Sequence, residues 1–142
     1  MEGETLRALG YAEVALVVAD AERSARFYID VVGYELGDFD VGEGARLIKV
    51  GPDHFMGLWE PNVWGSTRLP FEGAYGAQFR KQVGQAHLVF AIHQDDVQPL
   101  ADRLTKAGYP IHGPETHGDG SFHLYASDPD DHAMEWWGKR PD

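Results

Sequence analysis

The chain has 142 residues and a formal net charge of −11, with 43% apolar and 12% aromatic residues. This content suits the core of one compact domain or two small modules and argues against general disorder. The acidic balance argues against binding to nucleic acid, whose phosphates need basic patches, and it is compatible with cationic ligands. The chain contains no cysteine, which excludes disulfides and thiolate metal sites.

No segment of the sequence predicts membrane insertion or secretion. The chain has no run of 18 apolar residues, and its start, Met-Glu-Gly-Glu-Thr, lacks the basic region and apolar stretch of a signal peptide. We therefore expect a cytoplasmic protein without a membrane span.

The first part of the chain, residues 1–60, predicts one β-α-β-β-β module. Asp20 is expected to cap a helix that runs to Val32 and ends at Gly33, since glycine is favoured just past a helix end. Runs of β-branched and aromatic residues around a glycine-rich turn predict the strands. These strands are expected at residues 13–18, 34–39, 45–50 and 54–59.

Residues 61–85 interrupt this pattern. They are rich in glycine and contain two prolines, so they predict a linker. The segment carries too many aromatic residues for a passive spacer, and it could fold over a pocket. These aromatic residues are Trp64, Phe71, Tyr75 and Phe79.

The pattern restarts in residues 86–142, which predict a second module of the same kind. Asp95 or Asp96 is expected to cap its helix, and residues 113–120 are expected to form a loop that carries His117. The buried face of the helix is expected to consist of Val97, Leu100, Leu104 and Ala107. The strands are expected at residues 87–92, from residue 111, at residues 122–126 and at residues 133–137.

The internal repeat aligns residues of different chemistry. The last strands of the two modules match almost residue for residue, with Gly57 aligned on Glu135. In the first strands, Glu13 aligns with His87. Two such modules paired edge to edge would bring these four positions together, because each lies on the first or last strand of its module.

A metal ion is one explanation for Glu135, the single acid in an otherwise apolar run. Burying an unpaired charge costs several kcal/mol, and a bound cation removes that cost. One imidazole and two carboxylates, from His87, Glu13 and Glu135, suit Mn, Fe(II), Ni, Co or Zn. Gly57 is expected to leave its corner unfilled, which would keep coordination positions open for substrate or dioxygen.

The sequence resembles the vicinal oxygen chelate superfamily, which includes glyoxalase I, fosfomycin-resistance enzymes, extradiol dioxygenases and bleomycin-binding proteins. Residues 13–20, 24–28, 33–34 and 128–135 carry this resemblance, which extends over residues 11–138. It implies an α+β fold in which two βαβββ modules form a paired, incompletely closed β-barrel with flanking helices. It does not imply one reaction, because one fold serves several chemistries.

Within this superfamily the chain resembles the extradiol ring-cleaving dioxygenases best. Their signature is matched by His117, Leu124-Tyr125, Asp128-Pro129 and Glu135. The resemblance implies that Glu135 and His87 are metal ligands and that Tyr125 and His117 contact the substrate.

Other positions extend or depart from this pattern. The resemblance implies an acid–base role for His54, at the start of the first module's last strand. His123 shares a strand face with Tyr125, because strand side chains alternate with period two, so His123 is expected to line the same cavity. Glu13 stands where the family has a second ligating histidine, and Asp131 stands where the signature has Gly or Pro.

These observations favour a metal-dependent enzyme that acts on a small molecule with two adjacent oxygen atoms. Fe(II) or Mn(II) is favoured for a ring-cleaving dioxygenase, and Ni or Zn would suit the alternative, a glyoxalase-like lyase or isomerase. A non-catalytic binder of the bleomycin-resistance type is a further alternative, supported by the acidic charge and four tryptophans. The resemblance also implies a homodimer.

Overall fold

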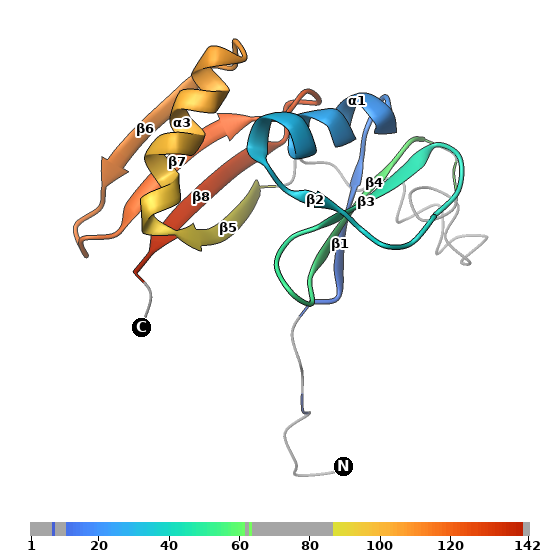
Figure 1. The fold of residues 1–142 in the computed structure, drawn as a ribbon, viewed down its shortest axis with the longest axis horizontal. Helices are drawn as coiled ribbons and strands as arrows, with labels where there is room; N and C mark the ends of the chain where they lie inside the picture. Colours follow the sequence, from blue (N-terminus) through green and yellow to red (C-terminus); the bar gives the residue numbers. More distant parts are fainter. Residues whose placement is uncertain (1–6, 8–10, 62, 64–86, 141–142) are drawn as a thin grey trace, which may run out of the picture.

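The computed structural model describes residue 7 and residues 11–61, 63 and 87–140. The described residues form two four-stranded mixed sheets, which stand side by side in Figure 1. The predicted α+β fold of two βαβββ modules is confirmed. The expected linker and its four aromatic residues lie outside the described residues, apart from Pro61 and Val63.

The first module contains β1 (Glu13–Val17), α1 (Ala21–Arg26), η1 (Phe27–Val32), β2 (Glu35–Leu36), β3 (Ala45–Lys49) and β4 (Phe55–Trp59). Its strands lie in the order β1-β4-β3-β2, with β1 parallel to β4. The strand predicted at residues 34–39 is reduced to β2, because both of its residues are exposed and only the Gly37 amide continues the pairing, to Leu47 O at 2.7 Å.

The helical segment of the first module is not one α-helix as predicted. Asp20 caps α1 by accepting a hydrogen bond from Arg23 N at 3.0 Å, which confirms the predicted start. The second half widens into the π-helical η1, where Gly33 N donates to Tyr28 O at 3.0 Å. Gly33 ends the segment with φ +99°, in the left-handed region that glycine adopts without steric cost.

The second module contains β5 (His87–His93), η2 (Gln94–Asp96), α3 (Val97–Lys106), β6 (Ile111–Thr116), β7 (Phe122–Ser127) and β8 (Ala133–Lys139). Its strands lie in the order β5-β8-β7-β6, with β5 parallel to β8, which repeats the topology of the first sheet. The loop predicted at residues 113–120 is shorter than expected, because β6 continues to Thr116 and pairs with β7 across an irregularity.

Two predictions about the second helix are confirmed in part. The side chain that caps this region belongs to His93, whose Nδ1 accepts from Asp95 N at 3.1 Å at the start of η2. Asp96 takes the N-cap position of α3 without a side-chain hydrogen bond. Val97, Leu100 and Leu104 are buried as predicted. Ala107 is exposed because it is the C-cap, past the end of α3, and Ala101 completes the buried face.

The strand register confirms the internal repeat. In the first sheet Ala15 lies opposite Gly57, and in the second sheet Val89 lies opposite Glu135. Both pairs belong to parallel strands at the edge of a four-stranded sheet. Gly57 and Glu135 therefore occupy equivalent positions.

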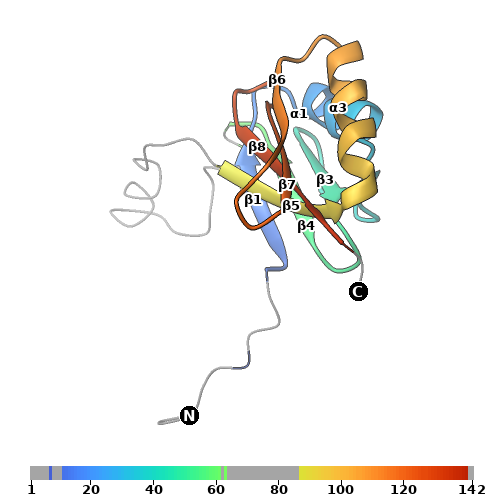
Figure 2. The same ribbon diagram turned by 90° about the vertical axis from the view of Figure 1, so that its left-hand side faces the viewer.

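The two modules share one hydrophobic core. Figure 2 shows α1 and α3 together on one side of the molecule, with the strands beside them. Tyr28, Met56, Leu104 and Trp136, two residues from each module, all belong to this cluster with 2% or less of their surface exposed. Within the described residues no helix is long and apolar enough to span a membrane.

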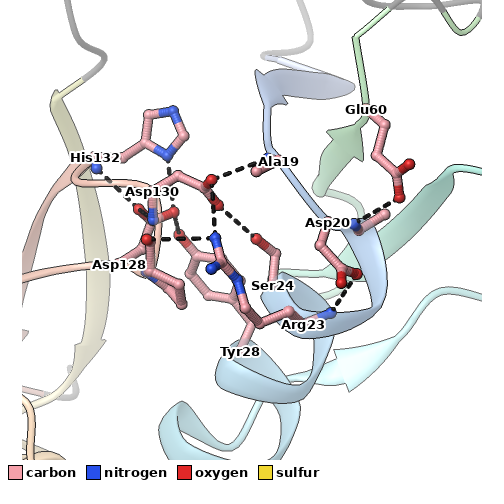
Figure 3. Close-up of polar contacts among 11 residues, drawn as sticks. Ala19, Asp20, Arg23, Ser24, Tyr28, Glu60, Asp128, Asp130 and His132 are labelled. Atoms are coloured by element: carbon pink, nitrogen blue, oxygen red, sulfur yellow. Dashed lines mark hydrogen bonds and ion pairs between the residues drawn. The ribbon is translucent and has the colours of Figure 1, made fainter.

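A polar latch between the modules lies at one end of this core (Figure 3). The Tyr28 hydroxyl of the first module donates to Asp128 Oδ2 at 2.7 Å, and both side chains are buried. Asp130, in the same turn, accepts from Ala19 N at 2.9 Å and from Ser24 Oγ at 3.0 Å. The turn before β8 is therefore fixed against the first module.

The substitution Tyr28→Phe is expected to lower the free energy of unfolding by about 1–3 kcal/mol, because the buried Asp128 carboxylate loses a donor. Burial and the charge of Asp128 raise the pKa of Tyr28, so the phenol remains a donor at all working pH values. Urea denaturation measures the change. The control Tyr11→Phe, at a side chain that is 80% exposed, is expected to have almost no effect. Equal stability of both variants would show that the Tyr28–Asp128 hydrogen bond does not stabilise the fold.

Candidate functional site

One face of the second sheet gathers most of the predicted site residues. The register places Glu135 of β8 between Val89 of β5 and Tyr125 of β7. His87 lies two residues before Val89 and His123 two residues before Tyr125, so both share the face of Glu135. We call this surface the histidine face; it consists of His87, His123, Tyr125, Glu135 and Trp137.

The Glu135 carboxylate is bound by a histidine on each side. Its Oε1 lies 3.1 Å from His87 Nε2, and its Oε2 lies 2.7 Å from His123 Nδ1. The side chain of Glu135 is 12% exposed, against 50% for His87 and 8% for His123. The acid is thus nearly buried, and the two imidazoles offset the cost of burying it.

The other nitrogen of the His123 ring is also bound. Ser121 Oγ lies 2.6 Å from His123 Nε2 and 2.5 Å from Asp119 Oδ1. The side-chain and backbone hydrogen bonds from Ser121 hold the pKa of Asp119 below its usual value. Neither Asp119 nor Ser121 was predicted as a site residue, although the period-two spacing that links His123 to Tyr125 also includes Ser121.

A second set of contacts lies beside the first. His117 Nε2 is 3.1 Å from the Tyr125 hydroxyl and 3.2 Å from Glu115 Oε1. Glu115 Oε2 is 3.0 Å from His112 Nε2, and this hydrogen bond is the main reason that the pKa of Glu115 is lowered. His112 and Glu115 were not predicted as site residues, because residues 113–120 were expected to form a loop and β6 extends to Thr116.

Aromatic rings on this side of the sheet are nearly parallel. The His117 and His123 ring centroids are 3.7 Å apart with an interplanar angle of 7°. The Trp137 ring lies 5.7 Å from that of His123 at 15°. The His123 ring is therefore held between two other rings, and its rotation is restricted.

The Tyr125 phenol is maintained in its protonated form. Partial burial raises the pKa of Tyr125, and the negative charges of Glu135 and Glu115 raise it further. A raised phenol pKa means that the proton stays on the oxygen at neutral pH. Tyr125 can therefore donate a hydrogen bond to a ligand on the histidine face.

Glu13 is not part of this group. Its Oε1 accepts a hydrogen bond from Trp59 Nε1 at 3.0 Å, within the first sheet. A Cβ atom on Gly57 would overlap both Glu13 Oε1 and Trp59 Nε1. The prediction that Gly57 leaves an unfilled space is therefore wrong, because the Glu13 and Trp59 side chains fill it.

His54, the predicted acid–base residue, lies directly before β4 and is exposed. Its backbone oxygen accepts from Val50 N at 2.8 Å. Its side chain makes no hydrogen bond or ion pair with the described residues, so its acid–base role stays a prediction.

The predicted metal ligands fit an ion only in part. In the described part of the chain, no group of three or more His, Asp or Glu side chains could hold a metal ion. His87 Nε2 and Glu135 Oε1, 3.1 Å apart, do have a suitable spacing, since adjacent ligands of an octahedral ion with bonds of about 2.1 Å lie about 3.0 Å apart. Glu13, the third predicted ligand, contacts Trp59 instead.

Two βαβββ modules, whose four-stranded sheets share one strand order, define a protein of the vicinal oxygen chelate class. The family model described as the Glyoxalase/Bleomycin resistance protein/Dioxygenase superfamily matches residues 10–136. The chain belongs to this superfamily, so the resemblance seen in the sequence is confirmed.

The chain is similar in sequence to a curated protein over part of its length. Catechol-2,3-dioxygenase from Bacillus subtilis (strain 168) is 28% identical over 101 residues, which cover 69% of this chain and 32% of that protein. The chain thus spans about a third of the length of that relative.

Two solved structures illustrate the similarity in fold. Lactoylglutathione lyase from Agrobacterium tumefaciens has a TM-score of 0.70 and 24% identity, covering 92% of this chain and 94% of that chain. The fosfomycin resistance protein FosX from Mesorhizobium loti has a TM-score of 0.62 and 17% identity, covering 95% of this chain and 94% of that chain. At these identities the structures show the fold alone.

The substitution Gly57→Ala is expected to lower the free energy of unfolding by about 1–3 kcal/mol, since the new methyl group would overlap the Glu13–Trp59 pair. Urea denaturation, with tryptophan fluorescence as the signal, measures this change. The control Gly118→Ala meets no atom within 4 Å and is expected to be nearly neutral. Equal stability of the two variants would show that the Glu13–Trp59 pair does not occupy the space beside Gly57.

The substitution Glu135→Gln is expected to lower the pKa of Tyr125 towards the ordinary tyrosine value, because a negative charge beside the phenol is removed. NMR of protein labelled with ¹³C-tyrosine measures this titration. The control Glu35→Gln, at an exposed residue of β2, is expected to leave the titration unchanged. An unchanged Tyr125 pKa in Glu135→Gln would exclude the electrostatic contact.

Proposed function

We propose that the chain is a metal-dependent enzyme, similar to extradiol dioxygenases, which acts on a small catecholic molecule or another substrate with two adjacent oxygen atoms. The observation that carries this proposal is the pair of His87 and Glu135, 3.1 Å apart, on a sheet face that also carries Tyr125. The 28% identity to a catechol-2,3-dioxygenase supports it.

His87 and Glu135 would hold the ion, with Glu13 as the third ligand once its carboxylate leaves Trp59. Bound Fe(II) or Mn(II), which we favour over Ni or Zn, would supply Lewis-acid and redox chemistry to the substrate. The nitrogen and oxygen donors suit these ions. His87 is the more accessible of the two, with 50% of its side chain exposed against 12% for Glu135, so an ion would be reached from the side of His87.

The chain's own residues would orient the substrate and handle its protons. Tyr125 keeps its proton and would donate a hydrogen bond to a substrate oxygen. His117, 3.1 Å from the Tyr125 hydroxyl, would contact the same region of the substrate. His54 is proposed as the acid–base residue on the family resemblance, and His123 as part of the wall of the site.

We also propose a homodimer. Among the described strands, β1 and β5 each form one edge of a sheet, and each exposes an apolar side chain: Val17 at 47% and Val89 at 50%. Unpaired edge strands favour association. Pairing of β1 in one copy with β5 in another would place the strands that carry Glu13 and His87 side by side.

A second candidate function is the binding of a cationic aromatic molecule without catalysis. It is favoured by the position of Glu13, which contacts Trp59 and not the other two predicted ligands. The stacked rings of His117, His123 and Trp137, in a chain with a net charge of −11, would suit such a ligand.

Anaerobic reconstitution with Fe(II) or Mn(II) separates the two functions. We expect about one ion per chain by mass spectrometry, and oxygen consumption with catechol. We expect both to be lost in Glu135→Ala, because this substitution removes a ligand, and retained in the control Glu35→Ala. Failure of the untagged wild-type protein to retain any of Fe, Mn, Ni or Zn would overturn the metalloenzyme and favour the binder.

A further inference from the structure

We propose that Asp119, Ser121 and His123 form a relay that fixes the Glu135 carboxylate, so that Oε2 is held and Oε1 faces His87. His123 is then a positioning residue that acts through Glu135. This inference rests on the proposed function in one respect, since it assumes that Glu135 is the ligand to be positioned.

Each link of the relay is a short polar contact. Asp119 Oδ1 lies 2.5 Å from Ser121 Oγ, which lies 2.6 Å from His123 Nε2. His123 Nδ1 lies 2.7 Å from Glu135 Oε2. Charge-assisted hydrogen bonds have such lengths and are stronger than neutral ones. The relay runs from an exposed loop acid to a nearly buried strand acid.

The available protons give the relay a direction. The Ser121 hydroxyl has one hydrogen, and the ionised Asp119 carboxylate, whose pKa is lowered by bonds from Ser121, can only accept it. The Ser121 oxygen is therefore left to accept from His123 Nε2–H. The relay therefore requires a second ring proton, on Nδ1, which an imidazolium donates to Glu135 Oε2 across the 2.7 Å contact.

The same arrangement distinguishes this relay from a nucleophilic serine with a histidine base. A nucleophilic hydroxyl must give its proton to the imidazole. Here Asp119 is the acceptor of that proton, at 2.5 Å. Ser121 is accordingly a link that orients the His123 ring and not an attacking group.

Packing restricts the ring further. His123 is 6% exposed and is stacked between His117 and Trp137. A ring that cannot turn keeps Nδ1 directed at Glu135. With Oε2 bound in this way, Glu135 offers Oε1 alone to an ion beside His87. Partners that orient a ligand in this manner commonly contribute 10- to 100-fold to metal affinity.

NMR of the metal-free protein with ¹⁵N-labelled histidine tests the relay without any metal. We expect a proton between His123 Nδ1 and Glu135 that exchanges slowly with water in the wild-type protein. The substitution Ser121→Ala is expected to speed that exchange strongly, because the ring loses its bond on Nε2. The control Ser127→Ala, at an exposed serine at the other end of β7, is expected to leave the signal unchanged.

Titration with Mn(II), followed by the EPR signal of the free ion, tests whether the relay raises the affinity for a metal ion. We expect the Kd to rise about tenfold in Ser121→Ala and up to about 100-fold in His123→Phe. His123→Asn, whose side-chain amide can donate from the place of Nδ1, is expected to recover most of the affinity. Ser121→Ala keeps the test valid even if His123→Phe does not fold.

The outcomes separate the relay from the proposed function. An unchanged NMR signal in Ser121→Ala would overturn the relay. If the wild-type protein binds Mn(II), an unchanged Mn(II) affinity in Ser121→Ala would overturn it too. A signal that responds to Ser121→Ala in a protein that binds no Mn(II) would support the relay and overturn the metal function.

Discussion

The buried Asp128 carboxylate connects the two halves of the molecule and determines where the last strand begins. Its Oδ1 accepts from the backbone amides of Asp130 and His132 at 2.9 and 2.8 Å. Its Oδ2 lies 2.7 Å from the Tyr28 hydroxyl and 2.8 Å from His132 Nδ1. Four contacts satisfy a charge that would otherwise be costly to bury. The strand that carries Glu135 starts from this turn, so the site depends on the contact between the modules.

This arrangement assigns a structural role to part of the dioxygenase-like signature. Asp128-Pro129 stands between Tyr125 and Glu135 in sequence, but its acid points at the first module and not at the histidine face. The turn positions the strand, while Tyr125 and Glu135 are adjacent partners across β7 and β8. A local sequence motif thus combines residues that serve a site with residues that secure the fold.

Features that depend on short-range pattern were predictable from the sequence. The cap at Asp20, the end at Gly33 and the two-module repeat all follow from local chemistry or from self-similarity, and the structure contains them. The π-helical η1 and the His93 cap were not predicted, because each depends on how a helix meets its neighbours.

The site was predictable where alternation along a strand applies, as for His123 and Tyr125, which share one face with Glu135. The site was not predictable where the position of a side chain depends on tertiary packing. The sequence suggests empty space at Gly57, but in the fold the missing Cβ atom is what allows Glu13 to reach Trp59. Whether a glycine leaves space or accommodates a neighbouring side chain therefore depends on the residues around it.

The broken symmetry of the repeat has a consequence for protein engineering. The register places Leu47 opposite Gly57 where the second sheet has Tyr125 opposite Glu135, and Ala45 takes the position of His123. The backbone is duplicated, but the chemistry is not. A twin centre could not be installed by an acid at Gly57 alone, since the Glu13–Trp59 pair already fills that volume. Building one would require simultaneous redesign of three strands.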